Sequence, residues 1–311
     1  MMQSPVQPFC ARRKDNRPSR ERYATRTVTF PSGSRSCRGD LYLPEGHRDP
    51  PAIVMGPGIG ACRRFGYSAV AERFAEAGYA VLLFDYRGFG ASDGGSGLVD
   101  PHQQQTDYAA AVDHLAERTE IGDRVALWGW SLGGGHALAV AAERDDIDAV
   151  VSVAPITDGR TLVRRRPRIA QGRAVLSGMR DAVGHRVGLG QELPIVSDTS
   201  RAAVLPDPDA KRAYLDLVDA DSSWHNAVPA RSLLQLARYR PAERLDAVET
   251  PVCLLAGRAD QLVPVDTLDD VAERLPEPTQ IKTPATHFSP LGDDLDSAIG
   301  YAVTFLAEAI E

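Results

Sequence analysis

RVALWGWSLGGGHALAVAAE, residues 124–143, joins a short apolar run to an alanine-rich run through a turn in which glycines flank Ser131. Residues 124–128 have the length and apolar composition of a buried strand, and residues 132–143 predict a helix. A Gly-x-Ser-x-Gly between a strand and a helix is typical of a nucleophile elbow, a strained turn that presents the serine hydroxyl at the helix N-terminus. We therefore expect Ser131 to be a nucleophile; the alternative is a serine that only caps the helix.

Strand and helix patterns alternate on both sides of this turn. A hairpin pattern begins at Ala24, where two alternating segments are separated by Pro-Ser-Gly-Ser. Further apolar runs typical of strands cover residues 51–55, 79–84, 147–153, 251–256 and 279–282. Helical patterns cover residues 67–77, 102–118, 265–275 and 296–309. This order predicts an α/β fold with a mostly parallel central sheet and helices on both faces.

Two parts of the chain depart from this alternation. Residues 1–22 are polar, rich in Arg and Pro, and without periodicity, which predicts a loose N-terminal arm. Residues 156–246 are rich in Arg and contain prolines but no alternating strand pattern, which predicts a helical insertion after a core strand. Residues 23–155 and 247–311 would then form the two parts of the core. An insertion at the carboxyl edge of the strands is expected to lie over the site there as a cap or lid.

Composition narrows the class of protein further. The 311 residues carry a net charge of −7 without a basic stripe, which argues against nucleic acid as a partner. No run of about 18 apolar residues predicts a membrane span, and the N-terminus lacks the apolar segment of a secretory signal. Four scattered cysteines, without metal-ligand or disulfide spacing, favour a reducing cytoplasm: Cys10, Cys37, Cys62 and Cys253. We expect no metal and no other cofactor.

A serine hydroxyl needs a base to take its proton and an acid to hold that base. In proteins with a nucleophile elbow, the chain order is serine, acid, histidine, so the base follows the last strand. His287 is the histidine in that position. His136 lies one helical turn beyond the serine and should point away from it. Asp260 follows the strand pattern of residues 251–256 and is the expected acid, whereas Asp158, after the preceding strand, is the alternative.

Two backbone amides are expected to bind the oxyanion of an acyl-transfer reaction. One belongs to Leu132, directly after the nucleophile, and the other to Ile59 in the loop Gly-Pro-Gly-Ile-Gly of residues 56–60. Three residues of the insertion, Trp224, His225 and Tyr239, could line a substrate pocket, or Trp224 and Tyr239 could pack the insertion on the core. The arginines between residues 160 and 173 could contact an anionic substrate, but a solvated helix face is the expected reading.

At these residues the sequence resembles the α/β-hydrolase superfamily, from about Ala24 to the C-terminus. In that superfamily the segment like FDYRGFGASDG, residues 84–94, braces a loop, which implies a structural role for Asp85, Arg87 and Ser92. A narrower resemblance is to dienelactone-hydrolase-like and acetylxylan-esterase-like enzymes, a branch that includes fungal polyketide transferases and thiohydrolases. The matching segments are SLGGGHAL (131–138), APITDG (154–159), WHNAVPAR (224–231) and YRP (239–241).

This resemblance implies the α/β-hydrolase fold and acyl transfer to water or to an alcohol. We therefore expect a serine hydrolase that cleaves a small-molecule carboxylic ester or thioester through an acyl-enzyme. The alternatives are an acyltransferase with the same three residues and a ligand-binding protein that keeps the fold without catalysis. The sequence leaves the acyl group and the oligomeric state, monomer or dimer, open.

Overall fold

The computed structural model describes residues 22–95, 97–164, 166–198, 203–219, 224–276 and 278–310. The expected N-terminal arm and Cys10 therefore lie outside the described residues, apart from Arg22. Within the described residues, eight strands form the central sheet in the order β1-β2-β4-β3-β5-β6-β11-β12. Their bounds are β1 (Tyr23–Ser32), β2 (Arg35–Pro44), β3 (Ala52–Gly56), β4 (Ala80–Asp85), β5 (Val125–Trp130), β6 (Ala149–Val153), β11 (Val252–Gly257) and β12 (Thr279–Thr283).

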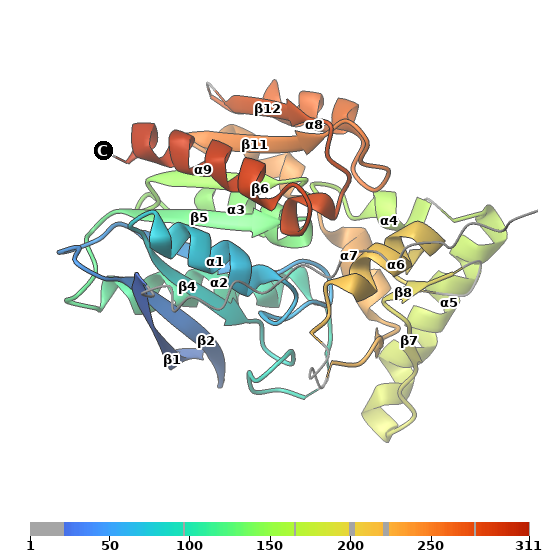
Figure 1. The fold of residues 1–311 in the computed structure, drawn as a ribbon. Coiled ribbons are helices and arrows are strands. Elements are labelled where there is room, and N and C mark those ends of the chain that lie inside the picture. Colours follow the sequence, from blue (N-terminus) through green and yellow to red (C-terminus); the bar gives the residue numbers. More distant parts are fainter. Residues whose placement is uncertain are drawn as a thin grey trace, which may run out of the picture.

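The sheet is antiparallel at one edge and parallel elsewhere. The β1–β2 hairpin pairs with β4 in antiparallel register, whereas β4, β3, β5, β6, β11 and β12 run parallel. Helices cover both faces, with α1 and α9 in front of the sheet and α2 and α3 behind it (Figure 1). The core helices are α1 (Tyr67–Glu76), α2 (Pro101–Ala116), α3 (Leu132–Ala141), α8 (Val265–Ala272) and α9 (Leu295–Ala309). This arrangement confirms the fold class that the alternating pattern predicts.

A helical insertion separates β6 from β11 in the chain. Its helices are α4 (Arg160–Arg164), α5 (Arg168–Gly184), α6 (Pro208–Asp216) and α7 (Ser232–Arg238), with the 3-10 helices η1 (His185–Val187) and η2 (Pro241–Ala247). In the described part of the insertion, the structure adds four strands of two residues each, too short to give an alternating pattern: β7 (Glu192–Leu193), β8 (Val196–Ser197), β9 (Leu205–Pro206) and β10 (Val228–Pro229). The insertion lies beyond the carboxyl ends of the core strands, and α5 forms its outer edge (Figure 1).

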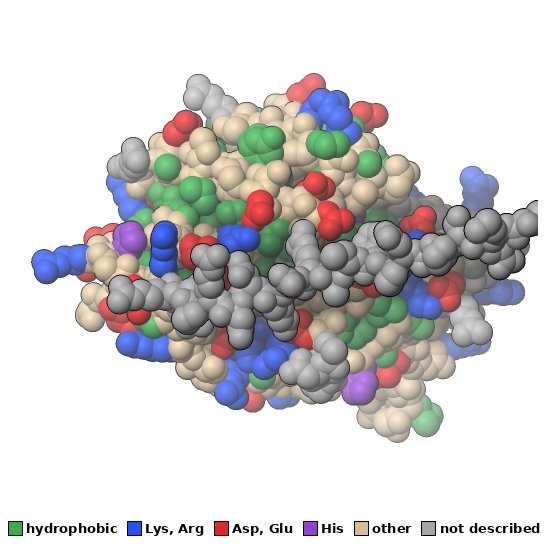
Figure 2. All heavy atoms as spheres, viewed as in Figure 1, with side chains coloured by type: hydrophobic (Ala, Val, Ile, Leu, Met, Phe, Trp, Pro, Cys, Tyr) green, Lys and Arg blue, Asp and Glu red, His purple; other side chains and the backbone are tan. Residues whose placement is uncertain are grey.

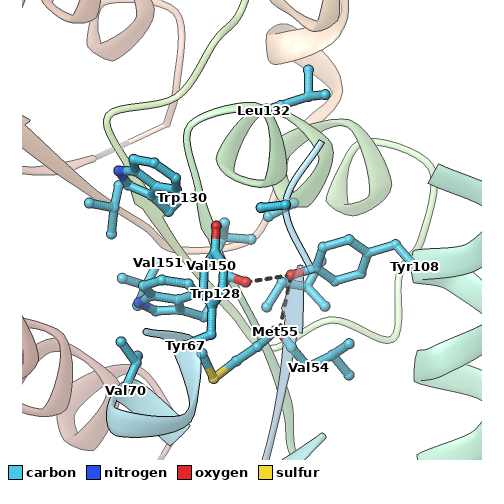
Figure 3. Close-up of a cluster of buried hydrophobic side chains, with 14 of the residues drawn as sticks. Val54, Met55, Tyr67, Val70, Tyr108, Trp128, Trp130, Leu132, Val150 and Val151 are labelled. Atoms are coloured by element: carbon cyan, nitrogen blue, oxygen red, sulfur yellow. Dashed lines mark hydrogen bonds between the residues drawn. The ribbon is translucent and has the colours of Figure 1, made fainter. Parts of the chain in front are cut away.

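The buried centre of the sheet supports the turn that carries Ser131. Val54, Met55, Val150 and Val151 belong to one buried hydrophobic cluster with aromatic side chains (Figure 3). The aromatic residues labelled there are Tyr67, Tyr108, Trp128 and Trp130. The hydroxyl of Tyr108 lies 2.6 Å from the carbonyl oxygen of Trp128 and 3.0 Å from that of Val54, so α2 is joined to both central strands (Figure 3). This ring leaves space only for glycine at the end of β3, because a Cβ on Gly56 would lie 2.2 Å from Tyr108.

A buried polar link joins the insertion to the core. His136 on α3 is fully buried, with Nδ1 2.9 Å from the hydroxyl of Tyr239 and Nε2 3.1 Å from Oε1 of Gln104. Because that amide oxygen only accepts, Nε2 carries the proton and Nδ1 accepts from Tyr239. Burial lowers the pKa of His136 to about 3, so the imidazole is neutral at physiological pH.

The outer surface of the core carries both signs of charge. Figure 2 shows acidic and basic side chains interspersed over the face on view, without a large area of one sign. Among the described residues, no helix combines the length and the apolar character needed to cross a lipid bilayer.

The neutral His136 predicts a loss of stability in mild acid. The folded state holds this imidazole uncharged down to a pKa of about 3, while the unfolded chain protonates it below its ordinary value of 6.5. The stabilising contribution is therefore complete above pH ~6.5 and is lost as the pH falls towards ~3, by about 2 kcal/mol at pH ~5. Urea unfolding of the wild type and of His136→Gln, each at pH ~6.5 and at pH ~5, measures this loss of stability.

The variant should be less stable than the wild type at neutral pH and should lose less stability on acidification. The matched control is His47→Gln, because His47 is exposed and should leave the wild-type pH dependence unchanged. Equal pH dependence in the wild type and His136→Gln would contradict the expectation.

Candidate active site

The turn after β5 holds Ser131 in a strained backbone conformation. Its φ is 59° and its ψ is −118°, a region that residues with a side chain rarely adopt. The flanking glycines are required by packing: a Cβ on Gly129 would lie 2.1 Å from the carbonyl oxygen of Gly133, and a Cβ on Gly133 would lie 2.1 Å from that of Gly56. The Ser131 amide donates to the carbonyl of Val153 at 2.8 Å, which fixes the turn to the end of β6.

Ser131, His287 and Asp260 lie in one hydrogen-bonded chain. Nε2 of His287 is 3.0 Å from Oγ of Ser131, and Nδ1 is 2.7 Å from Oδ2 of Asp260. Because the carboxylate only accepts, Nδ1 carries the proton and Nε2 is free to accept from the serine hydroxyl. Each of the three residues is 4% exposed, so the chain is shielded from bulk water.

The loop after β11 fixes the orientation of Asp260. Its Oδ1 accepts from the backbone amides of Leu262 and Val263 at 2.7 and 2.8 Å, which leaves Oδ2 for His287. The end of β11 and the loop after β12 also approach each other closely, because a Cβ on Gly257 would lie 2.3 Å from the carbonyl oxygen of Ala285. The acid and the histidine are therefore held from two adjacent strand ends.

Trp130 joins the serine turn to the histidine loop. Its indole Nε1 donates to the carbonyl oxygen of His287 at 2.8 Å, and its ring packs against His287 and Phe288. Sequence reasoning missed this residue because it occupies a variable position of the Gly-x-Ser-x-Gly motif. The available signal was its immediate proximity to Ser131 in the chain.

Two backbone amides near Ser131 have no hydrogen-bond partner among the described residues, and they belong to Leu132 and Ile59. Leu132 opens α3, where the first amides of a helix point outwards. In the loop after β3, the amide of Gly58 donates to the hydroxyl of Tyr67, whereas the carbonyl of Ile59 accepts from Tyr214 at 2.6 Å. These contacts fix the loop on both sides and leave the Ile59 amide unused.

The alternative acid, Asp158, lies in a different pairing. Its carboxylate accepts from Arg160, with Nε at 2.9 Å from both oxygens, and this pairing lowers the pKa of Asp158 against the opposing effect of burial. The described contacts of its side chain involve Arg160, whereas Nδ1 of His287 contacts Asp260. The carboxylate next to His287 is thus that of Asp260.

The three expected pocket residues are divided between two places. Trp224 and His225 line a cavity of about 600 Å³ between the insertion and the loops after β3 and β4. The indole of Trp224 donates to the carbonyl of Gly60 at 2.8 Å, next to Ile59. Tyr239 lies apart from this cavity, with its hydroxyl on His136. Ser131 itself is not among the residues that line this cavity, and it is 4% exposed.

The arginines of the insertion also differ in their surroundings. Arg165 lies outside the described residues, whereas Arg164, Arg168 and Arg173 are exposed as a solvated face requires. Arg166 departs from that expectation: it is 4% exposed and donates to the carbonyls of Leu162, Ala203 and Val204. It is a buried crosslink of the insertion, which no periodic pattern in the sequence indicated.

Asp85, Arg87 and Cys62 have contacts or burial that indicate structural roles. Asp85 accepts from the amides of Arg63 and Ala91 at 2.8 and 3.0 Å, while Arg87 is paired with the buried Asp107. Burial raises the pKa of the Cys62 thiol to about 11, so it is protonated and unreactive at neutral pH. Among the described residues, no cluster of three or more His, Cys, Asp or Glu side chains could hold a metal ion.

The parallel sheet, the strained serine turn at the end of β5 and the histidine loop after the last strand define this protein as an α/β hydrolase. Residues 52–286 match the family model described as serine aminopeptidase S33, and the chain belongs to this family of α/β hydrolases.

Similar proteins come from bacteria and fungi. The quorum-quenching protein AidA of Acinetobacter baumannii is 35% identical over 243 residues, which cover 77% of this chain and 80% of AidA. The thiohydrolase aneE of Aspergillus aculeatus is 28% identical over 258 residues, 79% of this chain and 80% of the relative.

A third similarity extends to a solved structure. The polyketide transferase grgF of Penicillium sp. is 35% identical over 136 residues, 43% of this chain and 46% of the relative. The crystal structure of the α/β hydrolase GrgF from Penicillium sp. superposes with a TM-score of 0.78 and 23% identity, covering 92% of this chain and 99% of that chain. The likeness to the solved structure independently supports the fold.

Removing the indole hydrogen bond should loosen the histidine loop. Trp130→Phe keeps a ring in place but cannot donate to His287, so we expect kcat for an activated ester to fall about tenfold with little change in KM. Steady-state kinetics measures both constants. The matched control is Trp128→Phe: Trp128 is also buried but makes no hydrogen bond to this loop. An equal loss of kcat in the two variants would contradict the positioning role.

Proposed function

We propose that this protein is a serine hydrolase that cleaves a carboxylic ester or thioester through an acyl-enzyme intermediate. The observation that carries the proposal is the hydrogen-bonded chain from Oγ of Ser131 through His287 to Asp260, with distances of 3.0 and 2.7 Å. These are the contacts that a serine needs to lose its proton to a base and that the base needs to keep one tautomer.

The proposed first step uses the neutral imidazole as the base. Ser131 attacks the acyl carbon while Nε2 of His287 takes its proton, and the carboxylate of Asp260 stabilises the imidazolium that forms. The free amides of Leu132 and Ile59 donate to the oxyanion of the tetrahedral intermediate. The intermediate then collapses, the bond to the leaving group breaks, and His287 donates its proton to that group.

Water completes the reaction in a second cycle of the same groups. Nε2 of His287 takes a proton from the water that attacks the acyl-enzyme, and the same amides bind the second oxyanion. Collapse returns the proton to Oγ of Ser131 and releases the carboxylic acid. No metal or other cofactor enters these steps.

The insertion of residues 156–246 is proposed to act as a cap over this site. Tyr214 and Trp224 pack against Phe65 of the loop after β3, and Tyr214 also contacts Phe288 beside His287. This aromatic cover limits water at Ser131, which strengthens the electrostatic interactions of a bound substrate. Because Ser131 is 4% exposed, substrate entry requires the cover to move.

An acyltransferase with the same three residues is the second candidate. The burial of Ser131 favours it, since a site that excludes water gives a bound alcohol or amine time to attack the acyl-enzyme. The names of the relatives, one a thiohydrolase and another a polyketide transferase, show that both outcomes occur among similar proteins. Product analysis with and without an added alcohol distinguishes the two, because a transferase forms a new ester at the expense of the acid.

Hydrolysis of p-nitrophenyl esters from acetate to palmitate tests the proposal. The Ser131→Ala variant should lose at least about 10⁴-fold in kcat/KM on the preferred ester, because the nucleophile is absent. A fluorophosphonate should label the wild type covalently and leave this variant unlabelled. Wild-type turnover by Ser131→Ala would refute the proposal, and failure to label the wild type would favour a non-catalytic binding protein.

Matched carboxylate variants identify the acid. Asp260→Asn should lower kcat by about 10⁴-fold, since an amide at this position favours the wrong imidazole tautomer. Asp158→Asn removes a carboxylate of the same size from the neighbouring strand end and should retain most of the activity, because its partner is Arg160. The same assay with both purified variants measures the difference, and the reverse order of losses would exchange the two assignments.

A further inference from the structure

The outer face of the insertion exposes a stripe of apolar side chains. Among the described residues, eight large hydrophobic side chains are exposed, and six of them fall between Ile169 and Leu189. They are Ile169 (76% exposed), Leu176 (47%), Met179 (55%), Val183 (69%), Val187 (72%) and Leu189 (72%). This concentration in one short segment is unlike the scattered apolar residues of an ordinary surface.

The stripe faces solvent because the opposite face of α5 is fixed to the rest of the insertion. Ala174, Gly178 and Asp181 are the buried residues of α5, and a Cβ on Gly178 would lie 2.9 Å from the side chain of Leu234 on α7. The carboxylate of Asp181 accepts from the amide and the guanidinium of Arg231 at 2.9 and 3.0 Å.

The apolar residues of α5 share one face of the helix. Ile169, Leu176, Met179 and Val183 follow one another at spacings of seven, three and four residues, which places them on one side of a helix. That side is opposite the buried residues, and α5 lies at the outer edge of the molecule (Figure 1).

Exposed arginines flank this stripe. Arg168, Arg173, Arg180 and Arg186 are exposed, and none of them has an ion pair with another described residue. Asp181 is the single acidic residue in the sequence of α5, and it is buried against Arg231. Residues 156–246 contain 15 Lys and Arg against 11 Asp and Glu, although the whole chain has a net charge of −7. The outer face of α5 is therefore both apolar and positively charged.

We propose that this face binds the surface of an anionic lipid bilayer, with α5 lying in the plane of the interface. The aliphatic side chains would enter the boundary of the acyl chains while the flanking arginines contact lipid phosphates. Charge complementarity carries the choice of an anionic surface, because nothing acidic on the exposed face of α5 opposes these arginines.

Two other occupants fit the same face less well. A second copy of this chain in a symmetric contact would bring the positively charged face of α5 against the same face of its partner, which is repulsive. An acidic protein would satisfy the charges, but the stripe has no aromatic side chain, and such side chains dominate the energetic centres of protein interfaces. A row of Ile, Leu, Met and Val side chains flanked by arginines is instead suited to the boundary between lipid headgroups and acyl chains.

Binding of the full-length protein to vesicles tests the proposal. The probes are vesicles of phosphatidylcholine alone and vesicles with about one-third phosphatidylglycerol, pelleted with the protein at low and at high salt. We expect at least about tenfold stronger partitioning to the anionic vesicles and a loss of that preference at high salt. This binding is independent of Ser131, so Ser131→Ala should partition like the wild type.

Two paired variants test the face. Met179→Glu with Val183→Glu replaces part of the stripe by charged side chains, and Arg173→Glu with Arg180→Glu reverses part of the positive charge; each should weaken partitioning at least about tenfold. The matched controls are Tyr301→Glu, an exposed apolar residue on α9, and Arg26→Glu, an exposed arginine on β1; both should partition like the wild type. Far-UV circular dichroism and the Tm establish that each variant is folded.

Three results would overturn the proposal. The first is an absence of wild-type binding to the anionic vesicles. The second is binding that the controls weaken as much as the α5 variants do. The third is a wild-type dimer in light scattering that Met179→Glu with Val183→Glu converts to a monomer, because this would assign the face to a second copy of the chain.

Discussion

The strained backbone of Ser131 is the constraint on which the rest of the site depends. A residue with a side chain at φ 59° costs on the order of 1–3 kcal/mol, and the surrounding structure must hold it there. Two close approaches do so: α3 packs onto β5 at Gly129, and the loop after β3 packs onto α3 at Gly133. The hydrogen bond from Ser131 to Val153 adds the end of β6. Position 131 is therefore defined by three neighbouring strand ends.

The same parallel order explains why distant parts of the chain meet at this point. The carboxyl ends of β3, β5, β6 and β11 lie side by side, so loops from residues 56 to 260 converge on one edge of the sheet. Asp260 and His287 come from adjacent strand ends, and Trp130 connects the histidine loop back to the serine turn. Rigid strand ends thus position side chains that are 156 residues apart in the chain, as Ser131 and His287 are.

Much of the fold could be predicted from the sequence because its signals are local. The apolar run before Gly129 and the alanine-rich run after Leu132 identify the strand–turn–helix, and chain order alone singles out His287. The insertion is different, because its contacts link residues distant in sequence and follow no period. The burial of Arg166 against residues 203 and 204 depends on how the insertion folds on itself, and the contact between Tyr239 and His136 depends on how it folds over the core. Propensity carries no information on such pairings.

The insertion is attached to the core in two chemically different ways. On one side, the hydroxyl of Tyr239 is hydrogen-bonded to the buried His136 on α3. On the other side, the side chains of Tyr214 and Trp224 donate to the carbonyls of Ile59 and Gly60. The second attachment holds the loop that carries the Ile59 amide. If the proposed cap opens on that side, these two hydrogen bonds break and the loop is freed, so admission of a ligand and the geometry of that amide are thermodynamically linked.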